Sequence, residues 1–388
     1  MSLHQRPAAD QNFGLGPATE VRLFGSLADV GRDAWDACFS GELEGYDYLM
    51  AVEAAGLSGF DWRYCLVKQE GRVIAAAPAF FTDYSLDTTL TDSGRRFVAA
   101  TRKVARRAFT VRMACLGSPC TDDVRLGFAP DLSAEQQSLA LKVLLEAFEH
   151  AASDAECWLL AVKDAPEPQR ELWSGAARDG GYHLSPGMPA AVLDVDFQDI
   201  EAYLSRLSRA TRKDMRRKLR AMASLRIELV SDLSGLEPRI IELYRQTRHR
   251  SDLQFEDLTI GYFTEVLARM KERALCVLYW AGDDLLGFNL LLEDGTTLLD
   301  KLFCMDTRKG PAFNLYFVSW FTNVRLCIER GLTRYQSGQV GYENKLRLGS
   351  RLVGADLYFR HRRPLANCAL RWAAPLLSAD PVLRKNTS

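Results

Sequence analysis

The chain lacks any uninterrupted apolar run of the roughly 18 to 20 residues that a membrane-spanning helix requires. Its start, Met1 to Pro17, also lacks the charged-then-apolar layout of a secretory signal, so we expect a cytoplasmic protein. Nine cysteines occur, but no Cys-x-x-Cys pair and no cluster of cysteine with histidine. This pattern predicts neither a disulfide framework nor a zinc site, and we expect no metal.

The chain also lacks a clear excess of positive or negative charge. It has 49 Lys and Arg residues and 50 Asp and Glu residues, which gives a net charge of −1. That balance argues against a general nucleic-acid-binding protein. The basic residues are nevertheless grouped into islands, which attract phosphate-bearing ligands or an anionic surface such as a membrane. The islands hold seven Lys and Arg in residues 95–112, nine in 202–226 and six in 360–388.

An apolar fraction of 47% and a charged fraction of 26% are ordinary for a globular protein of two or three domains. The pattern of helix, helix, three strands, helix and strand occurs twice along the chain. We therefore predict an α/β fold with mixed sheets, built from two similar units. The first pattern covers 32–39, 46–56, 62–69, 73–80, 112–116, 134–152 and 157–162, with a later strand at 191–195; the second covers 237–249, 260–273, 274–280, 285–292, 297–304 and a helix from 313.

The predicted division of the chain has five parts. Residues 1–18 are expected to be disordered, while 19–198 and 227–363 form the two units. Between them, 199–226 hold a basic connector helix with an apolar stripe over 203–222, whose arginines are either a solvated surface or a contact for phosphate groups. Residues 364–388 form a basic amphipathic tail, which either lies on a bilayer or packs onto the last strand.

The second unit contains a candidate site for an acyl donor. Its strand 297–304 is followed by a basic loop with a glycine and then by a helix. Free N–H groups at a helix start, next to Arg and Lys side chains, bind anions, and coenzyme A and an acyl carrier protein both present phosphate. In the first unit the matching loop, 117–123, is acidic, so we predict a structural or acceptor-binding role there. The predicted donor-binding residues are Arg308, Lys309, Gly310, Ala312 and Asn314.

This order of elements resembles the GNAT superfamily of acyltransferases, with Arg308-x-Gly310-x-Ala312 one residue shorter than the usual signature loop. A more particular resemblance is to the FemAB-like branch, in which an Ile-Glu-x-Gly-Leu run precedes a glycine-hinged turn ending in lysine. The runs 328–332 and 338–345 look like that pair. The resemblance implies tandem GNAT folds and transfer of an acyl group from acyl-CoA or an acyl carrier protein to a primary amine. A lipidic amino alcohol or a cell-envelope precursor would supply that amine.

Acylation of an amine requires a base, because the acceptor arrives as an ammonium ion, and hydrogen-bond donors for the oxyanion and the departing thiolate. The candidate bases are Asp300 on the central strand, Glu343 in the turn and His249 after the first helix of the unit. Tyr342 is the candidate proton donor to the thiolate, and Lys345 is a further catalytic candidate. The alternatives are a structural ion pair of Asp300 and a turn that only closes the sheet. The predicted substrate-binding residues are His249, Arg250, Gln336, Gln339, Glu343 and Arg347.

Three rival functions stay open. An aminoacyl-tRNA-dependent transferase acting on peptidoglycan precursors is one, although the sequence shows no helical-arm insertion of the kind that often accompanies that activity. A non-catalytic binding protein that kept the fold is the second. DNA binding is third, because no aromatic residues interleave the charges of the connector, and we expect no specific nucleic-acid partner.

Overall fold

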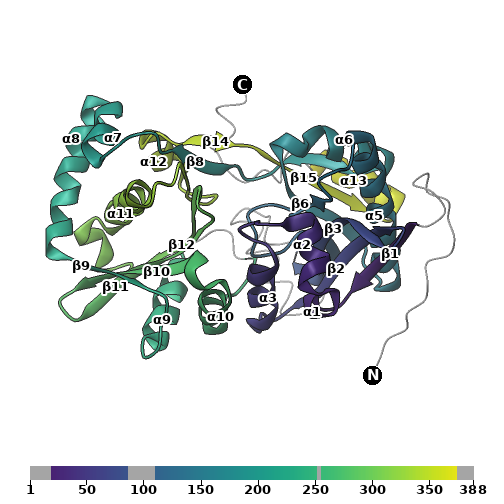
Figure 1. Ribbon diagram of the computed structural model, residues 1–388, viewed down its shortest axis with the longest axis horizontal. Coiled ribbons are helices and arrows are strands. Elements are labelled where there is room, and N and C mark those ends of the chain that lie inside the picture. Colours follow the sequence, from purple (N-terminus) through teal and green to yellow (C-terminus); the bar gives the residue numbers. More distant parts are fainter. Residues whose placement is uncertain (1–18, 86–109, 251–254, 374–388) are drawn as a thin grey trace. The chain divides into compact units, whose positions relative to one another are not determined.

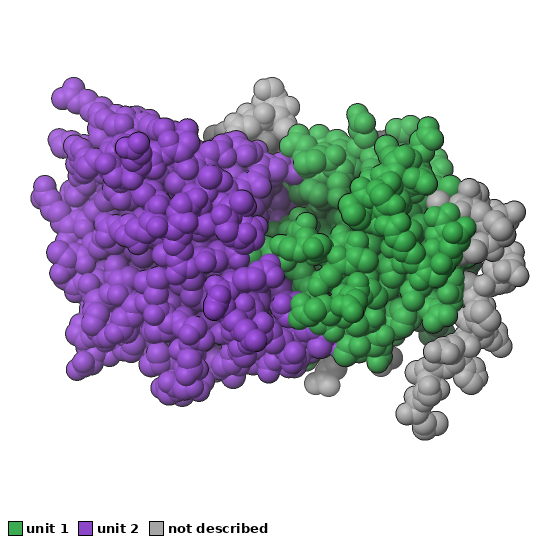
Figure 2. Space-filling model, in the orientation of Figure 1, with its two compact units in different colours: residues 1–46, 58–187, 355–379 green, residues 47–57, 188–354, 380–388 purple. Residues whose placement is uncertain are grey.

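The computed structural model describes residues 19–85, 110–250 and 255–373. Their contacts divide the chain into two compact units (Figure 2). Unit 1 takes the described residues up to 46, 58–187 and those from 355 onward, and unit 2 takes 47–57 and 188–354. The units are thus interleaved along the chain, whereas the sequence suggested the continuous segments 19–198 and 227–363. The predicted disordered start 1–18, most of the basic island 95–112 and the tail beyond 373 lie outside the described residues.

Unit 1 is built on a mixed sheet whose strands are β1 (Thr19–Phe24), β2 (Phe60–Gln69), β3 (Arg72–Ser85), β4 (Thr110–Leu116), β5 (Gly127–Phe128), β6 (Leu159–Pro166), β7 (His183–Pro186) and β15 (Ala355–His361). Among the described residues the strand order is β1-β2-β3-β4-β6-β15-β7, with β5 beside β3. Of the strand pairs that the structure describes in this sheet, β4 and β6 form the parallel one. The helices are α1 (Leu27–Val30), α2 (Arg32–Phe39), α5 (Ala134–Asp154), the 3-10 turn η2 (Glu167–Gln169), α6 (Arg170–Asp179) and α13 (Pro364–Ala373) (Figure 1).

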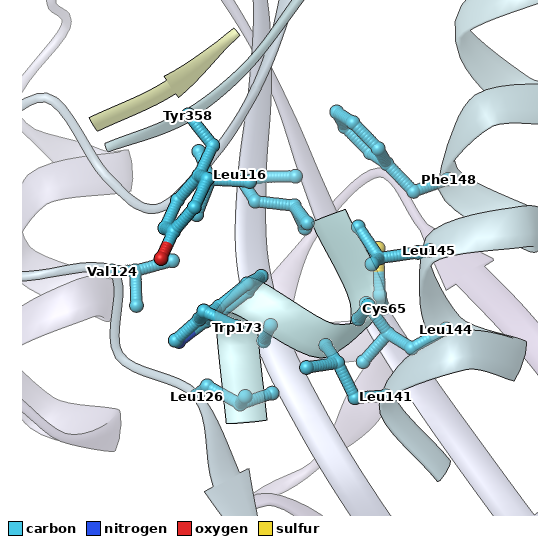
Figure 3. Close-up of a cluster of buried hydrophobic side chains, with 14 of the residues drawn as sticks. Cys65, Leu116, Val124, Leu126, Leu141, Leu144, Leu145, Phe148, Trp173 and Tyr358 are labelled. Atoms are coloured by element: carbon cyan, nitrogen blue, oxygen red, sulfur yellow. The ribbon is translucent and has the colours of Figure 1, made fainter. Parts of the chain in front are cut away.

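The long helix α5 shows how local sequence sets this architecture. A capping box starts it, in which Ser133 Oγ accepts from the N–H of Gln136 and the Gln136 side chain accepts from the N–H of Ser133. Its apolar face points into a core that also contains Cys65 of β2 and Trp173 of α6 (Figure 3). The sequence prediction of a helix over 134–152 is confirmed. The α5 residues labelled in that core are Leu141, Leu144, Leu145 and Phe148.

Unit 2 has a second mixed sheet, with the strands β8 (Ala190–Asp194), β9 (Arg226–Val230), β10 (Ala274–Ala281), β11 (Asp284–Glu293), β12 (Thr297–Met305), β13 (Arg334–Gln336) and β14 (Arg351–Val353). Their order among the described residues is β14-β8-β13-β12-β11-β10-β9, and β12 and β13 form the parallel pair. The helices are α3 (Tyr46–Ala54), α7 (Ile200–Arg206), α8 (Arg209–Lys218), η3 (Leu219–Ser224), α9 (Glu237–Arg248), α10 (Ile260–Met270), η4 (Lys271–Arg273), η5 (Gly310–Phe313), α11 (Leu315–Arg330) and α12 (Tyr342–Arg347). In Figure 1, α9 and α10 lie on one side of this sheet and α11 on the other.

Each sheet contains a strand from the other half of the sequence. β15, near the C-terminal end, pairs between β6 and β7, and β8 pairs between β13 and β14. The strand predicted at 191–195 is therefore present but belongs to unit 2. Backbone N–H and C=O groups of β6 and β13 would lose their partners without these inserted strands, so both halves of the chain are needed to complete each sheet.

The predicted single connector helix over 203–222 is wrong, because the structure divides it. α7 ends before Leu207, whose backbone is extended, and Ser208 caps the new helix α8 by accepting from the N–H of Thr211 at 3.2 Å. The expected apolar stripe is present, since Thr211 and Met215 are buried. No helix in the described part of the chain combines the length and apolar character needed to span a membrane.

Candidate functional site

The site is created where the parallel strands β12 and β13 separate. They pair only over Thr297–Leu299 and Arg334–Gln336, after which the chain leaves β13 through Ser337 and Gly338. On its other side β12 carries a register shift against β11 immediately after Asp300. Such a bulge bends a strand and redirects side chains. Asp300 is therefore the first residue of β12 beyond its pairing with β13.

A cavity of about 440 Å³ opens at this separation. Consecutive residues of β12, from Asp300 to Met305, form one wall, and the turn 337–341 forms another. The remaining walls come from α9, from the segment that follows it, and from α11. Most of the lining is apolar or aromatic, which suits the acyl or lipidic part of a substrate. Its charged side chains are Arg248, Arg250, Glu256, Asp300, Lys301 and Lys345.

Three neutral side chains hold the Asp300 carboxylate. Asn289 Nδ2 donates to Oδ1 at 2.9 Å, while Asn323 Nδ2 and the Tyr335 hydroxyl donate to Oδ2 at 3.1 and 3.0 Å. The Asn289 oxygen in turn accepts from the hydroxyls of Tyr279 and Ser319, which fixes the orientation of its amide. These donors hold the carboxylate in one position, and among the described residues it has no direct ion pair.

Burial raises the pKa of Asp300 above its usual range, because a charged carboxylate is poorly solvated deep in the protein. The hydrogen bonds from Asn289 and Tyr335 and the nearby Lys345 charge oppose that change but do not cancel it. The side chain still keeps partial contact with solvent through the cavity. A carboxylate with a raised pKa that a ligand can reach is a competent general base.

Lys345 is buried and binds the turn that follows β13. Its ammonium group donates to the carbonyl of Ser337 and, at 3.2 Å, to that of Gly338. These bonds fix the cavity wall, and the positive charge favours ionised Asp300. The structure therefore brings together two of the three predicted catalytic residues, Asp300 and Lys345.

The third, Tyr342, lies elsewhere. Its side chain is buried and its hydroxyl donates to the carbonyl of Pro189 at 2.9 Å, so it does not line the cavity beside Asp300. Glu343 is exposed on α12 and is absent from the lining as well. Neither side chain is placed to exchange a proton with a substrate beside Asp300.

Some of the predicted substrate-binding residues line the cavity beside Asp300 and others do not. Gln339 and Arg250 line the cavity beside Asp300, and Gln339 donates to the carbonyl of Met188 at 3.2 Å. Gln336 is absent from the lining. Arg347 instead pairs with Asp214 of α8 at 2.6 Å.

The loop predicted to bind the donor borders a second cavity of about 530 Å³. Arg308, Lys309 and His249 line it, together with Arg250 and Thr307, which also line the first cavity. The predicted N–H cradle is occupied by the protein itself, because Asp306 Oδ1 accepts from the backbone N–H groups of Arg308 and Lys309 at 3.0 and 2.9 Å.

The other members of the predicted donor loop have structural positions. Gly310 is buried against Met305, where an added Cβ would lie 3.1 Å from the sulfur. Asn314 has a left-handed backbone and accepts the first backbone bonds of α11. Ala312 is exposed in η5. A phosphate at this loop would therefore meet the side chains of Arg308 and Lys309.

Unit 1 also has a parallel strand pair, β4 and β6, but its own chain occupies the equivalent place. Val124 N donates to the carbonyl of Asp164 at 3.3 Å, and Lys163 Nζ to that of Thr121 at 2.5 Å. Buried Glu44 contacts Arg125 at 3.1 Å in the same loop. The structural or acceptor-binding role of the first unit stays a prediction.

The sequence analysis missed the polar stripe of α11. Tyr316, Ser319 and Asn323 are spaced three and four residues apart and all face β12 or the cavity. That spacing within an otherwise apolar helix is the signal that could have identified them. Asn289 and Tyr335 gave no such signal, because single polar residues in strands are common. In the described part of the chain, no group of three or more His, Cys, Asp or Glu side chains could hold a metal ion.

Comparison with known proteins agrees with this architecture. A crystal structure of FemX matches 87% of this chain and 96% of its own, with 13% identity and a TM-score of 0.55. A tandem GNAT protein from the clavulanic acid biosynthesis pathway, solved without AcCoA, matches 89% of this chain and 99% of its own, with 12% identity and a TM-score of 0.53.

At these identities the similarity concerns the fold, and the predicted tandem GNAT-like α/β fold is confirmed. No curated protein matches the chain in sequence. The model of the FemAB-like family, described as peptidoglycan biosynthesis/recognition, matches residues 26–354. Since that match covers most of the sequence, the chain belongs to the FemAB-like family.

Proposed function

We propose that the protein is an N-acyltransferase that acylates a primary amine in the cavity beside Asp300. The observation that carries the proposal is one carboxylate of raised pKa, held by three neutral donors where β12 and β13 separate. The family's description, peptidoglycan biosynthesis/recognition, supports a cell-envelope precursor as acceptor. The apolar lining supports a lipidic amino alcohol as the other candidate.

The chemistry follows from the position of the base. Asp300, directly or through one water molecule, takes a proton from the acceptor ammonium, and the freed nitrogen lone pair attacks the donor carbonyl carbon. As the C–N bond forms, the carbonyl electrons move to oxygen. When they return, the bond to the leaving group breaks and its electron pair departs with it, as a thiolate if the donor is a thioester. The second nitrogen proton goes to the thiolate or to water, and no covalent enzyme intermediate is required.

The donor is acyl-CoA or an acyl carrier protein in this proposal. Support comes from the cationic side chains of Arg308, Lys309 and Arg250 around the second cavity. Arg250 Nη2 donates to the carbonyl of Thr307 at 3.2 Å, and both residues border both cavities. One extended donor could therefore place its phosphate beside Arg308 and its thioester beside Asp300.

The first test is thermal unfolding of the full chain with acetyl-, octanoyl- and palmitoyl-CoA, followed by thiol release with a panel of primary amines. A ligand present at 100 times its dissociation constant stabilises the folded state by about 2.7 kcal/mol. We expect stabilisation, chain-length dependence and amine-dependent thiol release. Absence of all three, with CoA and carrier-protein donors alike, would contradict a thioester donor.

An aminoacyl-tRNA donor is the second candidate, because an aminoacyl-tRNA-dependent transferase would act on a peptidoglycan precursor and the family's description names peptidoglycan biosynthesis. The same base would serve, because the aminoacyl ester is also attacked by an amine and the ribose oxygen takes the place of the thiolate. Transfer of a radiolabelled aminoacyl group from charged tRNA to a peptidoglycan-precursor amine, without thioester activity, would establish this alternative. Binding of donors without transfer of either kind would indicate a non-catalytic binding protein.

We also propose that α13 contacts an anionic membrane on the cytoplasmic side when the acceptor is lipidic. Leu365 at its start is 89% exposed. The guanidinium of Arg363 lies 4.7 Å from the ring of Trp158, so basic and aromatic groups adjoin it. Exposed apolar residues beside arginine suit the interface of an anionic bilayer.

Vesicle sedimentation tests this contact. Binding to phosphatidylglycerol vesicles that weakens in Leu365→Asp supports it. Leu229→Asp is the control, because Leu229 is also an exposed leucine but lies on β9 of unit 2. Equal binding by both variants, or no preference over phosphatidylcholine vesicles, would contradict the proposal.

A further inference from the structure

The hydroxyl of Tyr316 is buried and has no hydrogen-bond partner among the described residues. Tyr316 lies in the first turn of α11 and lines the cavity beside Asp300. A Cβ atom built on Gly341, in the turn that forms another wall, would lie 4.0 Å from this hydroxyl. Leaving a buried donor unpaired costs about 1–3 kcal/mol, so such a group needs an explanation.

Four other side-chain donors that line the cavity are already engaged. The Tyr335 hydroxyl donates to Asp300, Ser319 Oγ donates to Asn289, and Trp320 Nε1 donates to the Tyr203 hydroxyl at 2.9 Å. Lys345 donates to two backbone carbonyls. Tyr316 therefore supplies a donor that the folded protein does not use itself.

The hydroxyl keeps its proton at neutral pH. Burial and the neighbouring Asp300 carboxylate both raise the pKa of Tyr316 above its usual range. A thiol has a pKa of about 8.5, so a departing thiolate is too weak a base to remove the phenolic proton. An oxyanion formed from a carbonyl group is far more basic, and a phenol that retains its proton is a suitable hydrogen-bond donor to it.

We propose that Tyr316 is a catalytic residue whose hydroxyl donates a hydrogen bond to the acyl carbonyl oxygen and stabilises the oxyanion formed during amine attack. This inference rests on the proposed acyl transfer and assigns a second reacting position to the same cavity. Asp300 on β12 removes the nitrogen proton, and Tyr316 on α11 receives the charge that develops on oxygen. The phenolic proton stays on Tyr316 throughout, so no bond to it is broken.

Replacing Tyr316 by phenylalanine removes only the hydroxyl and tests this role. Loss of one oxyanion donor lowers kcat by about 10²- to 10³-fold. The melting temperature should not fall, because the removed group has no partner in the folded protein. Tyr358→Phe is the matched control: Tyr358 is a buried tyrosine of unit 1 whose hydroxyl lies 3.2 Å from Ser174 Oγ, and loss of that hydroxyl should leave kcat unchanged.

A second experiment does not depend on turnover. In protein labelled with ¹³C at the tyrosine Cζ atoms, the Tyr316 resonance is identified by its absence in Tyr316→Phe, and methylphosphonate serves as a tetrahedral oxyanion. We expect this resonance to shift on binding and the variant to bind about tenfold more weakly, a difference near 1.4 kcal/mol.

The two experiments separate failure of this inference from failure of the proposed function. Wild-type kcat in Tyr316→Phe would overturn the role of Tyr316 while leaving acyl transfer intact. If the wild-type protein transfers no acyl group, acyl transfer fails and the phosphonate experiment decides alone. An unmoved Tyr316 resonance at saturating methylphosphonate would then overturn the inference, and a shifted one with weaker binding by the variant would support it.

Discussion

Asn289 on β11 donates from Nδ2 to Asp300 Oδ1 on the adjacent strand β12, at 2.9 Å. Asn289 cannot rotate away, because its own oxygen already accepts from Tyr279 at 2.9 Å and from Ser319 at 2.8 Å. The strand pair therefore fixes the carboxylate through an amide rather than through a cation. Burial of Asp300 can then raise its pKa, which a direct ion pair would prevent.

The raised pKa of Asp300 predicts a specific pH dependence of stability. Below the unfolded pKa of about 3.9 the group is protonated in both states, and between the two pKa values only the folded state holds the proton. Stability contributed by Asp300 is thus present at low pH and lost as pH rises through its folded pKa. The free energy of unfolding of the wild-type protein, relative to that of Asp300→Asn, should therefore fall as pH rises from the unfolded to the folded pKa of Asp300. The fall is about 1.4 kcal/mol for each pH unit between these two pKa values.

Urea denaturation of both proteins from pH 3.5 to 8 provides the measurement. The test uses only how the difference in free energy of unfolding between the two proteins changes with pH. Any cost of placing an amide at position 300 does not depend on pH, so it does not affect the result. A difference that stays flat or rises with pH would show that the folded protein does not raise the pKa of this carboxyl.

Tyr335→Phe should move the activity profile towards higher pH. The Tyr335 hydroxyl donates to Asp300 and lowers its pKa, so removing that donor raises the pKa further. Because the base acts when ionised, the acid limb of kcat against pH should shift upward, while the rate at high pH changes less. Tyr358→Phe, which removes a hydroxyl of unit 1, should leave the limb in place. An unshifted limb in Tyr335→Phe would mean that another group sets it.

Much of the fold could be predicted from sequence because its signals are local. The helices expected at 32–39, 134–152 and 260–273 correspond to α2, α5 and α10 within a few residues, since their apolar spacing lies within each segment. The pairing of β8 and β15 could not be predicted this way. Strand pairing depends on partners far away in sequence, and a pattern in 191–195 does not specify which sheet receives it.

The site was predictable to a similar degree. Asp300 and Lys345 were identified because charged groups stand out in a strand and in a glycine-hinged turn. The expectation that backbone N–H groups at Arg308 and Lys309 are free to bind an anion was wrong, because the Asp306 carboxylate accepts from both. This contact depends on the path of the backbone, which the sequence does not specify. Tyr316 was missed because the feature that identifies it is a buried hydroxyl without a hydrogen-bond partner among the described residues, and only the three-dimensional contacts reveal that feature.

Arg308→Glu should weaken binding of an acyl-CoA donor. The substitution reverses the charge of an exposed side chain in the second cavity, where the proposal places the phosphate. We expect most of the thermal stabilisation by acyl-CoA to disappear, with little change in the melting temperature of the free protein. Arg178→Glu, at an exposed position on α6 of unit 1, is the control. Equal stabilisation of both variants would remove Arg308 from the donor site.

Asp306→Ala should destabilise the protein by about 1–3 kcal/mol, because buried Asp306 accepts from two loop N–H groups and from Arg239 Nη2 at 2.9 Å. Burial opposes the charged form, but the N–H of Lys309 and the Arg239 guanidinium lower the pKa of Asp306 overall. Its stabilisation is therefore present above the unfolded pKa and is lost as pH falls through the folded pKa.

Unfolding of wild-type protein and Asp306→Ala at pH 7 and at pH 3 measures this effect, and the difference between them should shrink at the lower pH. Asp131→Ala breaks an exposed pair with Arg72 and should change stability much less, because solvent screens exposed ion pairs. Equal effects of the two substitutions would contradict the structural role of Asp306.

The most direct test of the central claim is the rate of amine acylation by Asp300→Asn across pH, with the best donor found for the wild-type protein. Removing a general base costs about 10²- to 10⁴-fold in rate. We predict a loss of that size, together with disappearance of the acid limb of the pH profile, in a variant that remains folded and binds the donor normally. A variant with wild-type kcat and an unchanged acid limb would show that Asp300 is not the base.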